Sequence, residues 1–125
     1  MMTAREIVAA LQSNGFDAAW ENTGGGVMNV DVPVTDAAGV DVGWVAVSHW
    51  GEWSSFDFDM GCGEVTVIAY DMATGDALPV VLWHPAAADR FEVPGDYALA
   101  TDAGTVVERV RAAVACVTAH GSPIG

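Results

Sequence analysis

The sequence contains no lysine, and its cationic side chains are limited to four arginines. Seventeen acidic residues oppose them, which gives a net charge of -13 at pH 7. A chain of this charge repels phosphate groups and anionic lipid headgroups, so electrostatics disfavours direct binding to nucleic acid or to a membrane surface. The same charge favours a protein partner with a basic surface, although an acidic excess also keeps an apolar chain in solution.

Cysteine is also scarce, because only Cys62 and Cys116 are present. The N-terminal residues lack the uninterrupted apolar segment and small-residue cleavage site of a secretory signal. Two cysteines without such a signal are typical of reduced thiols, so we expect a cytoplasmic protein. No long hydrophobic run is present either: charged residues interrupt the apolar segment 106–119, which is shorter than the roughly 20 residues of a membrane-spanning helix.

The sequence does contain signals for a helix near each end. A Thr-Ala-Arg-Glu capping box, followed by a glycine suited to the left-handed conformation, predicts a helix over residues 3–14. A second Thr-x-x-Glu box predicts a C-terminal helix that begins at Thr105 and ends near His120. The helix dipole favours a histidine in the last turn, so His120 needs no catalytic role.

Between these helices the hydrophobic period changes from helical to alternating, which predicts antiparallel strands. We expect one hairpin around the glycine-rich segment 22–26 and another over residues 64–83. In the strand 40–50, alternation places Trp44 on the core side. We therefore predict one α+β domain over residues 1–125, with a single antiparallel sheet of about five to seven strands packed against an N-terminal and a C-terminal helix.

Functional side chains are most concentrated in residues 48–64. The sequence Phe-Asp-Phe-Asp-Met at 56–60 alternates, which predicts a strand with its apolar side chains turned inward and its two aspartates in solvent. Two tryptophans bracket the preceding turn, and indoles beside carboxylates are typical of interface anchors, although Trp53 could instead cover the sheet edge. The predicted partner-binding surface consists of His49, Trp50, Glu52, Trp53, Asp57 and Asp59.

Two other functions stay open as alternatives. A metal-assisted hydrolase would use His49, Asp57, Asp59 and His84, but no HxH, HxxxH or CxxC spacing is present, and two aspartates about 6.6 Å apart on a strand are too far apart to hold one ion side by side. A DNA mimic ranks lower, because the carboxylates are scattered and do not match phosphates about 3.4 Å apart along each strand. No cofactor is expected, since the glycine-rich segment does not precede a helix.

The capped helix followed by "GFDAAWENTGGGVMNVDV" resembles small proteins of high-GC bacteriophages and actinobacteria. The resemblance covers about the first third of the chain and transfers no catalytic residues. It implies a role in the cytoplasm of an infected host, where the protein would occupy a surface of a host protein. The leading hypothesis is therefore a small acidic protein-binding module, with an enzyme as the less favoured option. Its apolar composition makes a homodimer a further option.

Overall fold

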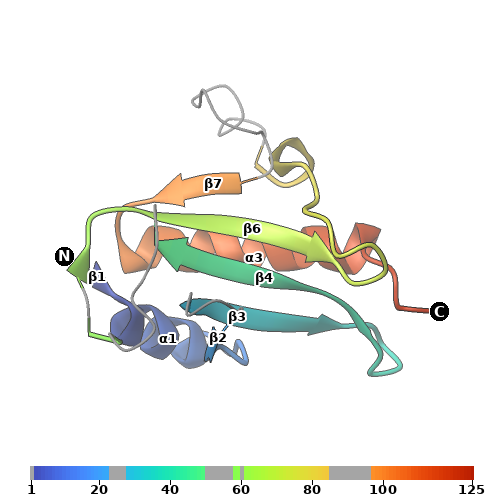
Figure 1. Cartoon of the computed structure of the whole chain (residues 1–125), viewed down its shortest axis with the longest axis horizontal. Coiled ribbons are helices and arrows are strands. Elements are labelled where there is room, and N and C mark those ends of the chain that lie inside the picture. Colours follow the sequence, from blue (N-terminus) through green and yellow to red (C-terminus); the bar gives the residue numbers. More distant parts are fainter. Residues whose placement is uncertain (1, 23–27, 50–57, 60, 85–96) are drawn as a thin grey trace.

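The computed structural model describes residues 2–22, 28–49, 58–59, 61–84 and 97–125. Its elements, in chain order, are β1 (Met2–Thr3), α1 (Ala4–Ser13), β2 (Ala19–Asn22), β3 (Met28–Thr35), β4 (Asp41–His49), β5 (Gly61–Cys62), β6 (Val65–Asp71), the 3-10 helix η1 (Val80–Leu82), β7 (Tyr97–Ala100) and α3 (Ala103–His120). Five strands form an antiparallel sheet in the order β2-β3-β4-β6-β7 (Figure 1). A separate antiparallel pair joins β1 to β5. The predicted α+β fold is confirmed.

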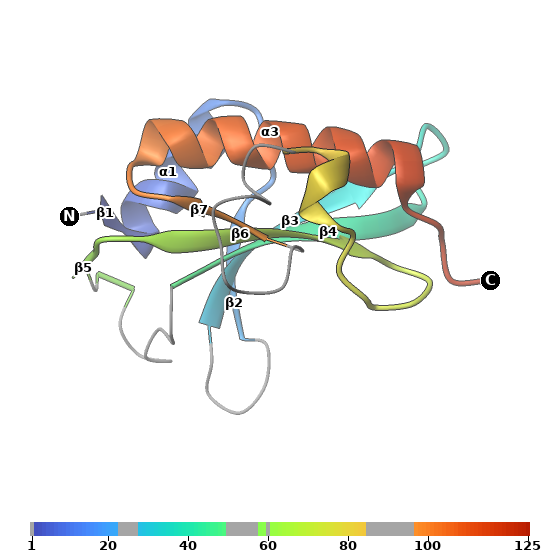
Figure 2. The ribbon, with the colours of Figure 1, turned by 90° about the horizontal axis from the view of Figure 1, so that it is seen from above.

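The helices α1 and α3 lie on one face of the five-stranded sheet, as the view from above shows (Figure 2). The first helix begins where the capping box predicts, because the Thr3 hydroxyl accepts a hydrogen bond of 3.1 Å from the Glu6 amide. It ends before Gly15, whose φ of 86° is the left-handed conformation that a glycine adopts without steric cost. The Phe16 amide then donates to the Leu11 carbonyl, and the ring packs against the core.

The helix α3 begins at Ala103, ahead of the predicted start at Thr105. Its cap is Asp102, whose carboxylate accepts from the Thr105 amide at 2.8 Å and from the Thr105 hydroxyl at 2.9 Å. The amide hydrogen bond is the main reason why the pKa of Asp102 is lowered. His120 lies in the last turn and is exposed, as predicted. In the described part of the chain, neither helix is long and apolar enough to cross a membrane.

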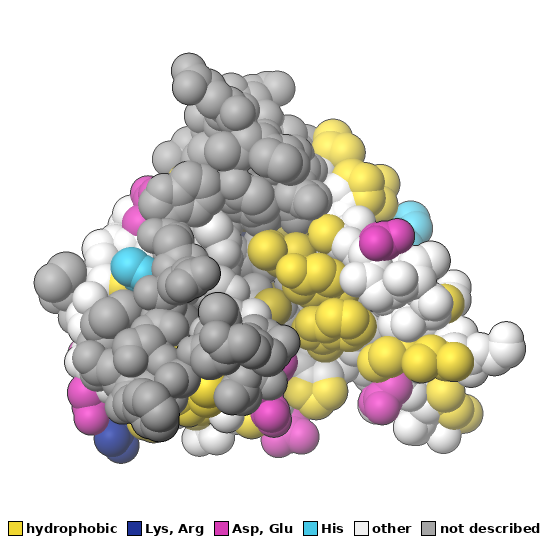
Figure 3. All heavy atoms as spheres, in the orientation of Figure 1, with side chains coloured by type: hydrophobic (Ala, Val, Ile, Leu, Met, Phe, Trp, Pro, Cys, Tyr) yellow, Lys and Arg dark blue, Asp and Glu magenta, His cyan; other side chains and the backbone are white. Residues whose placement is uncertain are grey.

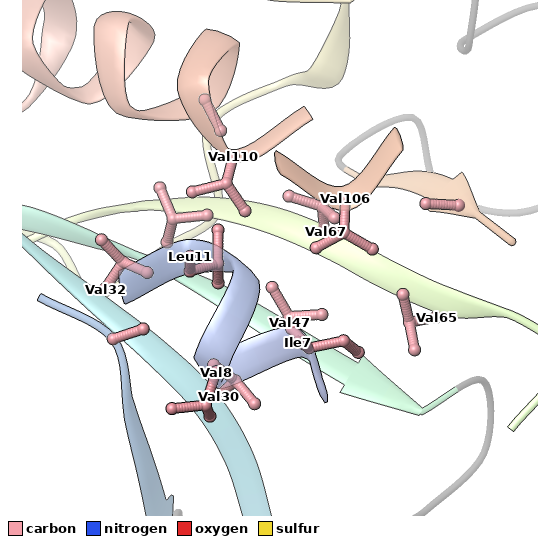
Figure 4. Close-up of a cluster of buried hydrophobic side chains, with 14 of the residues drawn as sticks. Ile7, Val8, Leu11, Val30, Val32, Val47, Val65, Val67, Val106 and Val110 are labelled. Carbon is pink, nitrogen blue, oxygen red and sulfur yellow. The ribbon is translucent and has the colours of Figure 1, made fainter. Parts of the chain in front are cut away.

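The core lies between the helices and the sheet and consists mainly of valine (Figure 4). Ile7 and Leu11 from α1, and Val106 and Val110 from α3, point toward the sheet and are fully buried. The sheet contributes Val30, Val32, Val45, Val47, Val65 and Val67, all of which are at most 2% exposed. These β-branched side chains suit the pleated surface, and their burial supplies most of the stabilisation.

The predicted core position of Trp44 is wrong. Val45 and Val47 on β4 face the helices, whereas Trp44 lies on the opposite face beside Pro33 and Tyr70 of the neighbouring strands. Apolar residues occur on both sides of β4, at odd and at even positions, so alternation alone does not show which side is buried. The smaller valines face the helices because α3 packs closely over this strand and leaves little room. A Cβ added to Gly43 would lie 2.5 Å from Val117 Cγ1.

Two predicted strands also differ from the structure. Within the segment 56–60, Phe58 and Asp59 lie in a turn, and the other three residues are outside the described part. The turn after β6 has Gly75 at a φ of 71°, but the chain after Pro79 forms η1 in place of a hairpin strand. Proline lacks the amide donor that a strand ladder requires, whereas its carbonyl accepts from the Leu82 amide and starts the 3-10 turn.

Candidate functional site

The predicted partner-binding surface is only partly within the described structure. His49 ends β4 and is half-buried, and Asp59 lies in the turn near α1. Trp50, Glu52, Trp53 and Asp57 lie outside the described residues. Of the predicted surface, the structure describes His49 and Asp59.

Asp59 forms an ion pair with Arg5 of α1. Arg5 Nε donates to Asp59 Oδ1 at 2.6 Å, and Arg5 Nη2 donates to Oδ2 at 3.2 Å. The guanidinium also lies over the Phe58 ring, 4.7 Å from its centre. Both charged side chains are more than 60% exposed, and the hydrogen bond from Arg5 lowers the pKa of Asp59. Asp59 is thus in solvent, as expected, but its negative charge is locally balanced.

The hydrolase alternative gains no support from the described residues. His49, Asp59 and His84 belong to three different segments: the end of β4, the turn beside α1 and the chain after η1. Over the described ranges, no group of three or more histidine, cysteine, aspartate or glutamate side chains is arranged to hold a metal ion. Cys62 and Cys116 are free, buried thiols, and burial raises the pKa of each, which makes them poor nucleophiles at neutral pH.

The face of the sheet opposite the helices carries a row of large side chains. Pro33 of β3, Trp44 of β4 and Tyr70 of β6 are paired across adjacent strands. The Trp44 and Tyr70 rings are stacked, with their centres 4.8 Å apart and their planes at 11°. Figure 3 shows hydrophobic side chains gathered on this face, with acidic side chains beside them. The sequence does not reveal this partly exposed pair of rings, because alternation along residues 40–50 predicts Trp44 on the buried side of the strand.

A hollow of about 320 Å³ lies beside this row, where β2, β3 and β4 meet. We call it the acidic hollow. Its apolar lining includes Pro33, Trp44 and Met72. Its charged lining consists of Asp17, Glu21, Asp31 and Asp41. Among the residues that the structure describes, every charged side chain that lines the acidic hollow is therefore negative.

Asp31 has the most perturbed carboxyl group in this hollow. Burial, and secondarily the charge of Glu21, raise the pKa of Asp31 from 3.8 to about 6. Strand pairing explains the second effect: Asp31 pairs with Ala19 and Glu21 pairs with Asn29, so the two acidic residues are diagonal neighbours. Asp31 Oδ1 is fully shielded and accepts no hydrogen bond from the described residues. Within the described ranges, Oδ1 of an ionised Asp31 therefore has no donor to compensate its charge.

A second hollow, of about 220 Å³, lies near the start of α3. It is lined by Glu64 and Arg109, which have opposite charges, and by the polar residues Thr101 and Thr105. Opposite charges within one hollow give no strong preference for a cation or an anion. The acidic hollow has a single sign of charge and an aromatic side chain, so we take it as the candidate site.

Comparison with models of known protein families, with curated proteins and with solved structures gave no match. The candidate site is therefore interpreted from its own chemistry. Carboxylates beside an aromatic ring attract a positively charged group directly and through a cation–π contact. The described site lacks a nucleophile hydrogen-bonded to a base, which is the arrangement that covalent catalysis requires.

Proposed function

We propose that this protein is a small acidic protein-binding module that docks a partner with a basic surface onto the sheet face opposite the helices. The observation that supports this proposal most strongly is the acidic hollow beside the stacked rings of Trp44 and Tyr70. Aromatic side chains supply apolar contact area, while surrounding carboxylates select a cationic partner and accelerate its approach. The net charge of -13 extends this attraction beyond the hollow.

The proposal retains the surface predicted from the sequence as an additional contact region. Trp50 and the residues after it follow β4 directly in the chain, so they are expected to add indole and carboxylate contacts to those of the sheet face. The resemblance to phage and actinobacterial proteins leads us to propose the host cytoplasm as the compartment and a host protein as the partner.

The experiment compares two immobilised variants that lose the same charge. Asp17→Asn/Asp41→Asn removes two negative charges from the acidic hollow, whereas Asp76→Asn/Glu108→Gln removes two from exposed positions elsewhere. Proteins captured from bacterial cytoplasm are identified by mass spectrometry. We expect a basic protein that binds the wild type and the control variant, is released by moderate salt, and is lost from the hollow variant.

Equal capture by both variants would contradict the proposed role of this face. It would show that only the overall negative charge attracts proteins. Trp50→Ala/Trp53→Ala is tested in parallel, because loss of capture in that variant alone would place the contact region on the 48–64 segment.

A further inference from the structure

The proposed function leaves the chemistry of the contact open. Building on it, we propose that the acidic hollow receives the guanidinium group of an arginine side chain from the partner. The site is thus a docking point for one planar cation at the edge of a larger contact.

The orientation of Trp44 provides the first argument. Tyr70 covers one face of the indole ring from β6. On the side of β3, Trp44 pairs with Pro33, and both residues line the hollow together with Asp31. A guanidinium is planar and weakly hydrated, so it stacks on an aromatic face while its N–H groups point sideways to carboxylates. The carboxylates of Asp17, Asp31 and Asp41 line the same hollow as this ring.

The hydrogen-bonding capacity of Asp31 provides the second argument. Its Oδ1 is shielded from solvent, and no donor from the described residues reaches it. A guanidinium presents five N–H donors in a fixed fork, so it can donate to a neighbouring carboxylate and, once the Asp31 side chain turns toward the hollow, to this oxygen as well. A lysine ammonium is a compact and strongly hydrated charge that does not stack in this way, so it is the weaker ligand.

The size of the hollow agrees with a side chain as its occupant. A volume of about 320 Å³ is at the lower end of the range for small-molecule sites, which run from roughly 300 to 1,000 Å³. The remaining surface beside the hollow, including the Trp44 and Tyr70 stack, is then available to the backbone and neighbouring side chains of the partner.

Binding should depend on pH through Asp31. The charged groups that face it in the described structure are Glu21 from β2, Asp17 before β2 and Asp41 from β4, and all are acidic. Burial and the charge of Glu21 oppose ionisation of Asp31, whose pKa is about 6, whereas an incoming cation favours ionisation. Affinity for the guanidinium therefore falls as the pH is lowered through this region.

The test uses three acetylated and amidated tripeptides, Gly-Arg-Gly, Gly-Lys-Gly and Gly-citrulline-Gly, titrated into the full chain and followed by amide NMR shifts. We expect the arginine peptide to shift the amides near Asp31 and Trp44, the lysine peptide to bind several-fold more weakly, and the neutral citrulline peptide not to saturate. Binding of the arginine peptide should weaken about ten-fold between about pH 7.5 and pH 5, because most Asp31 is then protonated.

Asp31→Asn tests the role of this carboxyl group without removing the aromatic side chain. This substitution should lower the affinity for the arginine peptide about ten-fold at neutral pH, since one charge-assisted interaction is lost. It should also abolish the pH dependence of binding. The control variant Asp76→Asn should leave the affinity for the arginine peptide and its pH dependence unchanged. Equal affinity for arginine and lysine peptides, or an Asp31→Asn variant that binds as the wild type does, would overturn the proposal.

The outcomes separate this proposal from the proposed function. Arginine-selective binding in the hollow without capture of any cellular protein would support the guanidinium site and refute the docking function. Capture that depends on the hollow's carboxylates, combined with equal binding of arginine and lysine peptides, would support the docking function and refute the guanidinium site.

Discussion

Replacing Asp31 with asparagine is expected to stabilise the protein at neutral pH. The folded chain raises the pKa of Asp31 from 3.8 to about 6, so ionisation of this group costs more in the folded state than in the unfolded state. A shift of about two units corresponds to an upper limit of about 3 kcal/mol. Because Asp31 is only partly buried, solvent screening reduces this to about 1 to 2 kcal/mol.

The sign of the effect follows from the raised pKa. Below about pH 4, Asp31 is protonated in both states, and the stability that it contributes is fully present. As the pH rises through about 6, the folded protein must also ionise this group, and that stability is lost. Asparagine is never ionised, so the gain in the variant should be present at about pH 7.5 and close to zero at about pH 4.

The assay is urea unfolding of wild type and variant, monitored by tryptophan fluorescence at both pH values. Other carboxylates, such as Asp102, have lowered pKa values and lose their stabilising effect in acid, but this loss is common to both proteins and cancels in the difference. Asp17→Asn, an exposed change in the same hollow, serves as the control and should change stability by about 0.5 kcal/mol or less. An equal free-energy difference at both pH values, or an NMR titration of Asp31 near pH 4, would refute the reasoning.

Four further changes test the fold. Gly43→Ala should lower the free energy of unfolding in urea by about 1 to 3 kcal/mol or more, because its Cβ would lie 2.1 Å from the Tyr70 carbonyl oxygen and 2.5 Å from Val117 Cγ1 of α3. Wild-type stability would contradict this close packing around β4. Leu11→Ala should lower the free energy of unfolding by about 2 to 5 kcal/mol in the same assay, since this side chain is fully buried. Thr3→Ala should lower the free energy of unfolding by about 1 kcal/mol, because it removes the hydroxyl that caps α1. Thr3→Ser keeps a hydroxyl and should lower it much less. Equal losses in the two variants would argue against capping. Both thiols should react with a thiol reagent only after denaturant is added, and fast labelling of the native protein would show that Cys62 or Cys116 is accessible.

Much of the fold was predictable from local signals in the sequence. The capping box at Thr3 and the glycine at position 15 located α1, and alternating valines located the strands. The start of α3 was harder to locate because both Asp102 and Thr105 are good capping residues, and the structure uses the first. The pattern of β4 was ambiguous because its two faces are similarly apolar, and only packing against α3 decided between them.

The candidate site was less predictable because it depends on strand register. Glu21 raises the pKa of Asp31 only because β2 and β3 pair with these residues on a diagonal. Pro33 lies beside Trp44 because of the pairing between β3 and β4. A single sequence shows which residues alternate along each strand, but it does not show which residues become neighbours across strands.

The position of α3 has a consequence for synthesis on the ribosome. This helix packs against β3, β4, β6 and β7, yet it follows all of them in the chain. Until residues 103–120 leave the exit tunnel, the valine-rich side of the nascent sheet lacks the cover that α3 provides. The antiparallel strands can pair early, but full burial of their apolar side must wait until α3 has been translated.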